Sequence, residues 1–343
     1  MLNDFFITRD VIGFLENYLR EEKIKIPAYA KKLSVLSDTQ FTSYEQWWEL
    51  LNELDGLLNT PALGLEIGRH IKVGDCGILG YLFRSSRDMS EALNCFKRFQ
   101  RLIYAGSQAH TELADNEVLS LVWNPELGYS SQISDELLLS AMVNITREIM
   151  HPHSFSPTQI SFTDSINKQD IQIYENFFCC PIKEKQTKLS VSFKLNDLKI
   201  LIPHEDGTLH SILGKQAEEL LKNLPDNDLF LVELRDTIIR SLHEGNADAD
   251  TIAKKLNMSG RTLHRRLKNK NRIFRDILKD IRKSMALTYL SDNKLTLTEV
   301  ALLLGYSDQS TFTRAFTLWY EKSPLKYKHQ FLNSKTKSLN LNS

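Results

Sequence analysis

Residues 306–320, "YSDQSTFTRAFTLWY", carry polar side chains at a spacing suited to reading nucleic-acid bases. Apolar residues recur at i, i+3, i+4 and i+7, which predicts a helix with one buried face. That face holds Phe312, Ala315, Phe316 and Trp319. The opposite face holds Gln309, Ser310, Thr313, Arg314 and Thr317. In the DNA major groove glutamine can pair with adenine, arginine with guanine, and a threonine methyl can contact thymine. An acidic side chain there would repel phosphate, and this helix carries none after Asp308.

An earlier stretch, 248–268, has a similar design. Its sequence "DADTIAKKLNMSGRTLHRRLK" predicts a helix, a short turn and a second helix. The apolar residues expected to pack between the two helices are Ile252, Ala253, Leu256, Leu263 and Leu267. Ser259 stands where an N-cap would satisfy the first amides of the second helix. The outward face of that helix is basic and comprises Arg261, His264, Arg265 and Lys268.

The two stretches are an internal repeat. Ala253 and Ala301 lie 48 residues apart, as do Ser259 and Ser307, so Ser307 is the predicted cap of the second unit. One extra residue precedes the aromatic core position of that unit. A single helix-turn-helix pattern occurs in many helical proteins, whereas two in succession are far more specific. The segment between them, 276–292, predicts a helix of roughly 25 Å that holds both outward faces toward major-groove segments about 34 Å apart.

Charge is segregated along the chain. The 343 residues include 43 Lys and Arg and 43 Asp and Glu, so the net charge is zero. From Gly245 onward there are 19 basic and 8 acidic residues, a balance of +11, which leaves 24 against 35, or −11, for the rest. One part of the chain is therefore suited to a polyanion and the other is not.

The pattern of elements predicts an α+β domain at 1–222, a linker at 223–228, an all-α DNA-binding domain at 228–332 and a disordered tail at 333–343. In the first domain, helices are expected near 8–22, 43–58, 61–71, 88–105, 131–150 and 208–222. Strands are expected at "EVLSLVW", "TQISF" and "LSVSF", which alternate or cluster β-forming residues. Pro27 and Pro61 are interpreted as separators between helices.

Signatures of other classes of protein are missing from the sequence. It has no G-x-S-x-G, H-E-x-x-H or P-loop spacing, so we expect no enzyme and no cofactor. His151 and His153 lack a third ligand nearby, which argues against a metal site. The four cysteines are too scattered for a disulfide framework. With no apolar run long enough to span a membrane and no signal peptide, the expected compartment is the cytoplasm.

The segments "SGRTLHRRLK", "IRKSMALTYL" and "TEVALLLGYSDQSTFTRAFTLWYEKSP" resemble the AraC/XylS family of bacterial transcription regulators, over residues 228–331. The resemblance implies that the first recognition helix reads DNA through Arg261, His264 and Arg265. It implies that the second does so through Gln309, Ser310, Thr313 and Arg314. Glu321 departs from the family, which usually has glycine at this position before the Ser-Pro pair.

The front of the chain resembles the arabinose-binding type of effector and dimerisation domain, in "TPALGLEIGRHIKVGDCGILGYLFRSSRDMSEALNCFKRFQRL" and "ENFFCCPIKEKQTKLSVSFKLNDL". The expected protein is thus a homodimeric activator that binds double-stranded promoter DNA, works with RNA polymerase and responds to a small-molecule effector. No residue pattern identifies that effector. The arginines considered for an anionic ligand are Arg84, Arg87, Arg98 and Arg101. The alternatives are a regulator controlled by abundance or a protein partner, and an architectural DNA binder with little sequence preference.

Overall fold

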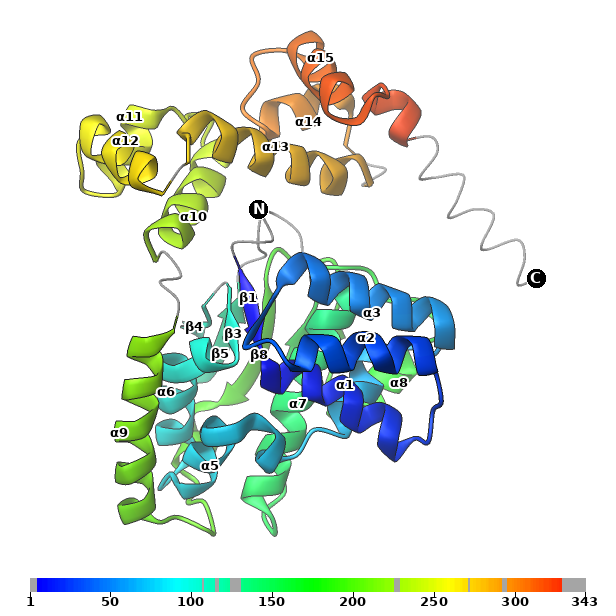
Figure 1. Ribbon diagram of the computed structural model, residues 1–343, viewed down its shortest axis with the longest axis vertical. Coiled ribbons are helices and arrows are strands. Elements are labelled where there is room, and N and C mark those ends of the chain that lie inside the picture. The colour runs from blue at the N-terminus through cyan, green and yellow to red at the C-terminus, as the bar shows by residue number, and fades with distance from the viewer. Residues whose placement is uncertain are drawn as a thin grey trace. The chain divides into compact units, whose positions relative to one another are not determined.

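The computed structural model describes residues 5–106, 108–114, 117–123, 131–224, 229–270, 272–291 and 295–328. The chain divides into two compact units with the boundary at residues 227–228 (Figure 1). The first mixes helices and strands and the second is built from helices in the part described, as the sequence predicted. Residues 225–228 of the predicted linker and the predicted disordered tail lie outside the described residues.

A five-stranded sheet forms one layer of the first unit, in the order β4-β5-β8-β6-β7. The strands are β4 (His110–Ala114), β5 (Val118–Trp123), β6 (Gln159–Ser161), β7 (Ile182–Lys183) and β8 (Leu189–Lys194). Neighbouring strands are antiparallel except for β6 and β7. The three predicted strands are confirmed as β5, β6 and β8. Leu121 and Val191, which are register partners, are fully buried.

Helices cover this sheet and fill the rest of the unit. They are α1 (Arg9–Glu21), α2 (Pro27–Ser37), α3 (Tyr44–Leu58), α4 (Leu63–Arg69), α5 (Gly77–Ser85), α6 (Met89–Phe99), α7 (Gln132–Met150), α8 (Ile171–Phe178) and α9 (Gly207–Asn223). Short 3-10 helices are η2 (Val73–Cys76), η3 (Gln100–Leu102) and η5 (Leu195–Lys199). Near its end the unit has α9 lying alongside α5 and α6 (Figure 1).

The structure differs from the sequence prediction for this unit at two places. Pro27 lies between helices as predicted, but it begins α2, a helix that was not predicted, because a proline at the first helical position needs no N–H partner. The helix expected at 88–105 ends at Phe99, and the chain turns through η3 into strand β3 (Tyr104–Ala105). β3 pairs with β1 (Phe6–Thr8), which also pairs with β2 (Phe41–Ser43) in a three-stranded sheet.

Helix α4 packs directly on α7 because two glycines face it. A Cβ on Gly64 would lie 2.0 Å from the Ile133 carbonyl oxygen, and one on Gly68 would lie 1.8 Å from a serine hydroxyl of α7. The same contact buries Glu136, whose carboxylate accepts the Gly64 N–H at 3.1 Å and the Tyr174 hydroxyl at 2.5 Å. Burial raises the pKa of Glu136 to about 7.

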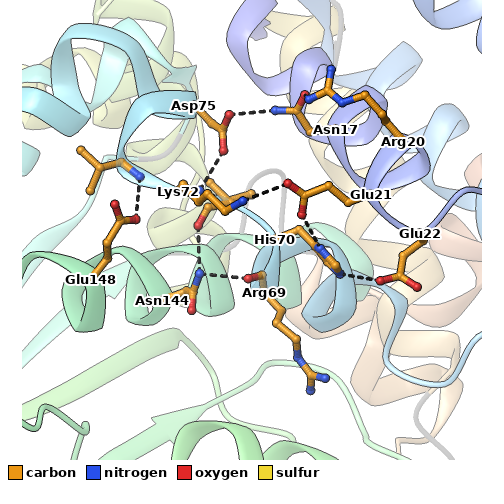
Figure 2. A network of polar contacts seen from close by, with 12 residues as sticks. Asn17, Arg20, Glu21, Glu22, Arg69, His70, Lys72, Asp75, Asn144 and Glu148 are labelled. Carbon is orange, nitrogen blue, oxygen red and sulfur yellow. Dashed lines mark hydrogen bonds and ion pairs between the residues drawn. The ribbon is translucent and has the colours of Figure 1, made fainter. Parts of the chain in front are cut away.

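Polar contacts fasten the segment after α4 to α1 and α7 (Figure 2). The His70 ring lies between two carboxylates of α1, 2.9 Å from Glu21 and 3.2 Å from Glu22. On the other side, the Asn144 amide of α7 donates to the carbonyl of Arg69 at 3.0 Å. Polar contacts between partly exposed side chains contribute little free energy, so we interpret the network as fixing the direction of the chain between α4 and η2.

The second unit comprises α10 (Leu229–His243), α11 (Ala249–Lys255), α12 (Gly260–Asn269), α13 (Phe274–Ser291), α14 (Leu297–Leu303) and α15 (Gln309–Tyr320). Within it, α13 runs between the group α10–α12 and the group α14–α15 (Figure 1). With 18 residues, α13 is about 27 Å long. Its buried face includes Ile277, Ile281 and Met285, as the apolar spacing predicted.

Candidate nucleic-acid interface

The first helix-turn-helix is shaped by two caps and one left-handed residue. Asp248 begins α11, and one of its carboxylate oxygens accepts two backbone N–H groups of the first turn, each at 3.0 Å. Asn257 in the turn has φ of +54°, a conformation that asparagine tolerates better than most residues. The Ser259 hydroxyl then accepts the backbone N–H of Thr262 at 3.2 Å. Ser259 is therefore the N-cap of α12, as predicted.

The second helix-turn-helix, formed by α14 and α15, repeats this turn 48 residues later. Gly305 takes the place of Asn257, with φ of +67°. In both turns the next residue returns a hydrogen bond to the first helix, from Met258 to Ala253 and from Tyr306 to Ala301, each at 2.9 Å. The predicted repeat thus extends to the backbone geometry of the turn.

The predicted cap of α15, Ser307, is wrong by one residue. The N-cap is Asp308, whose carboxylate accepts the backbone N–H of Thr311 at 2.8 Å and its hydroxyl at 2.9 Å. Ser307 donates its own hydroxyl to that carboxylate at 2.9 Å. The cause is the extra residue of the second helix-turn-helix, which lies between Tyr306 and the N-cap. These hydrogen bonds, with the backbone N–H of Thr311 first, lower the pKa of Asp308.

Helix α12 has the buried and exposed faces that the sequence predicted. Leu263 and Leu267 are buried, as are Ile252 and Ala253 of α11, the helix on which α12 packs. The four candidate contact residues are all exposed, namely Arg261, His264, Arg265 and Lys268. Among the residues the structure describes, none of the four forms an ion pair with an acidic side chain. Their charges and hydrogen-bond donors are thus available to a polyanion.

Helix α15 combines a buried aromatic face with an exposed polar one. Phe312 and Phe316 are fully buried and their rings lie 5.7 Å apart. The candidate contact residues Gln309, Ser310 and Arg314 are exposed, and Thr313 is partly buried. The side-chain oxygen of Gln309 accepts a hydrogen bond from the Thr298 hydroxyl of α14 at 2.8 Å.

That hydrogen bond was missed at the sequence level. Residues 298 and 309 belong to different helices, and only the turn between them brings their side chains together. With its oxygen held by Thr298, the Gln309 side chain is oriented before any DNA arrives. Its amide nitrogen still has hydrogens to donate.

Helix α13 is bonded to the second turn through a single arginine. Arg282 donates from Nε to the carbonyl of Leu304 at 2.8 Å and from Nη2 to the carbonyl of Gly305 at 2.9 Å. Its guanidinium also lies over the Tyr306 ring, 4.5 Å from the ring centre. A planar side chain bound at three points fixes the turn on the helix more firmly than one contact would. The turn that precedes α15 is thereby fastened to α13.

At the end of α15, Glu321 occupies the position where the resembling family usually has glycine. Its φ of +56° and ψ of 17° are left-handed, and its N–H donates to the Thr317 carbonyl at 2.9 Å. The helix therefore ends in the conformation that glycine favours, although the residue is glutamate.

Two of the four arginines considered for an anionic ligand are occupied by neighbouring carboxylates. Arg87 pairs with Asp88 at 2.9 Å and Arg98 with Glu218 at 2.6 Å, so these two arginines are engaged in separate ion pairs. Within the described part of the chain, no group of His, Cys, Asp and Glu is placed to hold a metal ion. Among the helices the structure describes, none combines the length and apolar character that a membrane crossing needs.

Comparison with known proteins decides the family. Residues 32–200 match the model of the arabinose-binding domain of AraC transcription regulators, N-terminal, and residues 252–330 match that of a helix-turn-helix domain. The HTH-type transcriptional regulator VirS of Mycobacterium tuberculosis is 32% identical over 301 residues, which is 84% of this chain and 84% of that protein. The chain belongs to the AraC/XylS family of transcription regulators.

Other AraC-family members are similar to this regulator over most of its length. The ornithine utilization regulator of Pseudomonas aeruginosa is 27% identical over 287 residues, covering 83% of this chain and 84% of its own. The HTH-type transcriptional regulator VqsM of the same organism is 22% identical over 336 residues, covering 95% and 99%. This AraC-family regulator therefore has an arabinose-binding-type N-terminal domain and a DNA-binding helix-turn-helix region.

Proposed function

We propose that this regulator activates transcription by binding a specific promoter sequence with α12 and α15 in two adjacent major-groove segments. The observation that carries the proposal is the repeated turn, which presents two capped helices with exposed faces free of acidic residues along their length. The residues proposed to contact DNA are Arg261, His264, Arg265, Lys268, Gln309, Ser310, Thr313 and Arg314. The balance of +11 from Gly245 onward supports a phosphate-driven contribution to affinity.

The two helices would contribute differently. The outward face of α12 is basic, so it combines phosphate contacts with pairing of Arg261 or Arg265 to guanine. The face of α15 is mostly uncharged, so it supplies less of the general affinity. Gln309, oriented by Thr298, is suited to adenine, and Thr313 offers a methyl group for thymine.

The first unit is proposed to form a homodimer and to bind a small-molecule effector that controls the DNA-binding unit. We further propose that the protein acts in the cytoplasm with RNA polymerase as a partner, and that it is not an enzyme. The arabinose-binding-type match supports a sensing role but does not specify a sugar as the ligand. A regulator without an effector, controlled by its abundance or by a protein partner, is the outcome to test against.

DNA footprinting of the full chain on the region upstream of its own gene would define a specific duplex. On that duplex, Arg265→Ala, Gln309→Ala and Arg314→Ala should each weaken binding by about 1–3 kcal/mol and leave a scrambled duplex nearly unaffected. Arg240→Ala is the matched control, because it removes an exposed positive charge from α10. If both α15 variants keep full discrimination at unchanged stability, α15 is a structural support and α12 alone reads the sequence.

A fragment of residues 226–332 should bind DNA by itself, with affinity that falls steeply as salt rises. A fragment that stays folded but binds no DNA at low salt would mean that the first unit supplies essential contacts. For the first unit, residues 1–222 should sediment as a dimer. A monomer whose melting temperature no metabolite raises would favour control by abundance or by a protein partner.

A further inference from the structure

The first unit contains an apolar cavity of about 150 Å³ between its helices and its five-stranded sheet. Helices α1, α3, α5, α6 and α7 and strands β5 and β8 contribute to its walls. Representative lining residues are Val11, Phe14, Leu79, Phe96, Met142 and Phe193. An engineered cavity of comparable size and lining in another protein stays dry and binds benzene. This volume therefore suits a molecule of about one aromatic ring.

The polar groups of the lining already use hydrogen bonds within the unit. The Trp47 indole donates to the Ser134 hydroxyl at 3.2 Å. The side-chain oxygen of Gln100 accepts a backbone N–H at 2.9 Å, and its amide nitrogen donates to a carbonyl at 3.0 Å. The Thr146 hydroxyl donates to a carbonyl of its own helix at 2.8 Å. A sugar or an amino acid would have to leave several polar groups unpaired here, which is strongly unfavourable.

The described lining residues of the cavity also lack the positive charge that an anionic ligand would need. Among the described residues that line the cavity there is no Lys, Arg or His, so an anionic ligand finds no countercharge. Asp135, which is buried, offers an anion no positive charge and already takes part in an interaction within the chain. Burial raises the pKa of the Cys76 thiol, which therefore stays neutral. The cavity is thus suited to an uncharged ligand.

We propose that this cavity is the effector site and that its ligand is a small uncharged molecule with mostly apolar surface, carrying one aromatic ring or a short alkyl chain. The inference rests on the proposed function, in which the first unit senses a small molecule. It specifies the class of that molecule and separates this regulator from one that senses a sugar or a charged amino acid.

The packing of α5 connects the cavity wall with α9, the last helix of the first unit. Leu79 and Phe83 of α5 line the cavity and also belong to the apolar cluster that holds α9. In that cluster, α9 contributes the fully buried Ala217 together with Leu213. A ligand that moves α5 therefore changes the surface on which α9 rests. α9 ends at Asn223, and the DNA-binding unit begins at residue 228.

The test is calorimetric titration of the full chain with indole and butylbenzene as apolar probes and with arabinose and ornithine as polar ones. We expect at least one apolar probe to bind and to raise the melting temperature, while the polar probes do neither. Ala92→Leu and Leu93→Trp place extra atoms in the cavity wall and should weaken probe binding at least tenfold. Ala30→Leu, the same change on an exposed position of α2, should leave probe binding unchanged.

Two results would overturn the inference. One is that neither apolar probe binds, or that a probe that binds does so equally well to a cavity-filled variant that remains folded. The other is that arabinose or ornithine binds and loses affinity in that variant. If Ala92→Leu unfolds the first unit, probe binding to Leu93→Trp is the deciding measurement.

A parallel titration on the specific duplex, with and without saturating probe, tests the proposed function separately. An unchanged DNA affinity with the cavity occupied would refute effector control and leave the ligand class of the cavity standing. Intact DNA binding with no probe binding would refute the inference alone.

Discussion

Replacing Glu321 by glycine should stabilise the DNA-binding unit. The residue ends α15 with φ of +56°, in the left-handed region. Holding a residue with a Cβ there costs roughly 1–2 kcal/mol, a penalty that glycine avoids. Glycine also gains freedom in the unfolded chain, which opposes the benefit by about 0.4–1 kcal/mol. The hydrogen bond from its N–H to the Thr317 carbonyl is unaffected by the substitution.

The difference predicts a net gain of about 0.5–1 kcal/mol, or about 2–8 °C in melting temperature for a unit of this size. The measurement is thermal unfolding of the fragment 226–332, followed by circular dichroism. Glu321→Ala removes the same side chain but keeps a Cβ, so it should change stability by less than about 0.5 kcal/mol. Lys322→Gly places glycine where φ is not positive and should destabilise the fragment.

The explanation fails if Glu321→Gly lowers the melting temperature, or if Glu321→Ala raises it equally. Either result would mean that the glutamate side chain, and not the backbone conformation, determines the stability of this helix end.

Three further predictions concern single side chains. Phe316→Ala removes a fully buried ring and should destabilise the second unit by about 3–5 kcal/mol, so that specific and random DNA lose binding together in anisotropy titrations. Asp308→Ala should cost about 0.5–2 kcal/mol of unfolding free energy and Ser307→Ala less than about 0.5; the reverse order would make Ser307 the cap. Glu136 has its pKa raised from 4.5 to about 7, so the folded state keeps a proton that the unfolded chain loses. The contribution of Glu136 to the free energy of unfolding is complete below pH 4.5 and is lost as pH rises to 7, by up to about 3 kcal/mol, which urea unfolding at several pH values would measure. If Glu136→Gln leaves the dependence of the unfolding free energy on pH unchanged, this explanation is wrong.

The helix-turn-helix units were predictable because their determinants are local. Apolar residues at helical spacing, such as Leu263 and Leu267, determine which face is buried. Ser259 satisfies amides within its own first turn. The one error, the cap at Ser307, arose because a constant offset of 48 residues was extended past the inserted position. The better signal was local: Asp308 stands three residues before Thr311, the spacing at which an N-cap side chain accepts a backbone N–H.

The first unit was less predictable because its contacts are distant in sequence. Phe6 pairs with Ala105 in a strand of only two residues, too short for an alternating pattern to be recognised. The cavity is lined by residues from Ile7 to Leu198, most of them apolar, and these apolar residues have the sequence signature of an ordinary core. A void forms only when the assembled helices leave space between them, and no local pattern records that.

The three-point attachment of Arg282 has a consequence for how binding sites of this regulator can change over generations. In the proposed mode of DNA binding, α12 and α15 contact adjacent segments, and Arg282 fixes the turn before α15 to α13; we therefore expect the distance between the two helices to vary little. One base pair inserted between the contacted segments turns the second by about 34° and shifts it by about 3.4 Å. Promoters should therefore lose regulation abruptly through insertions and deletions at that point, but only gradually through base substitutions.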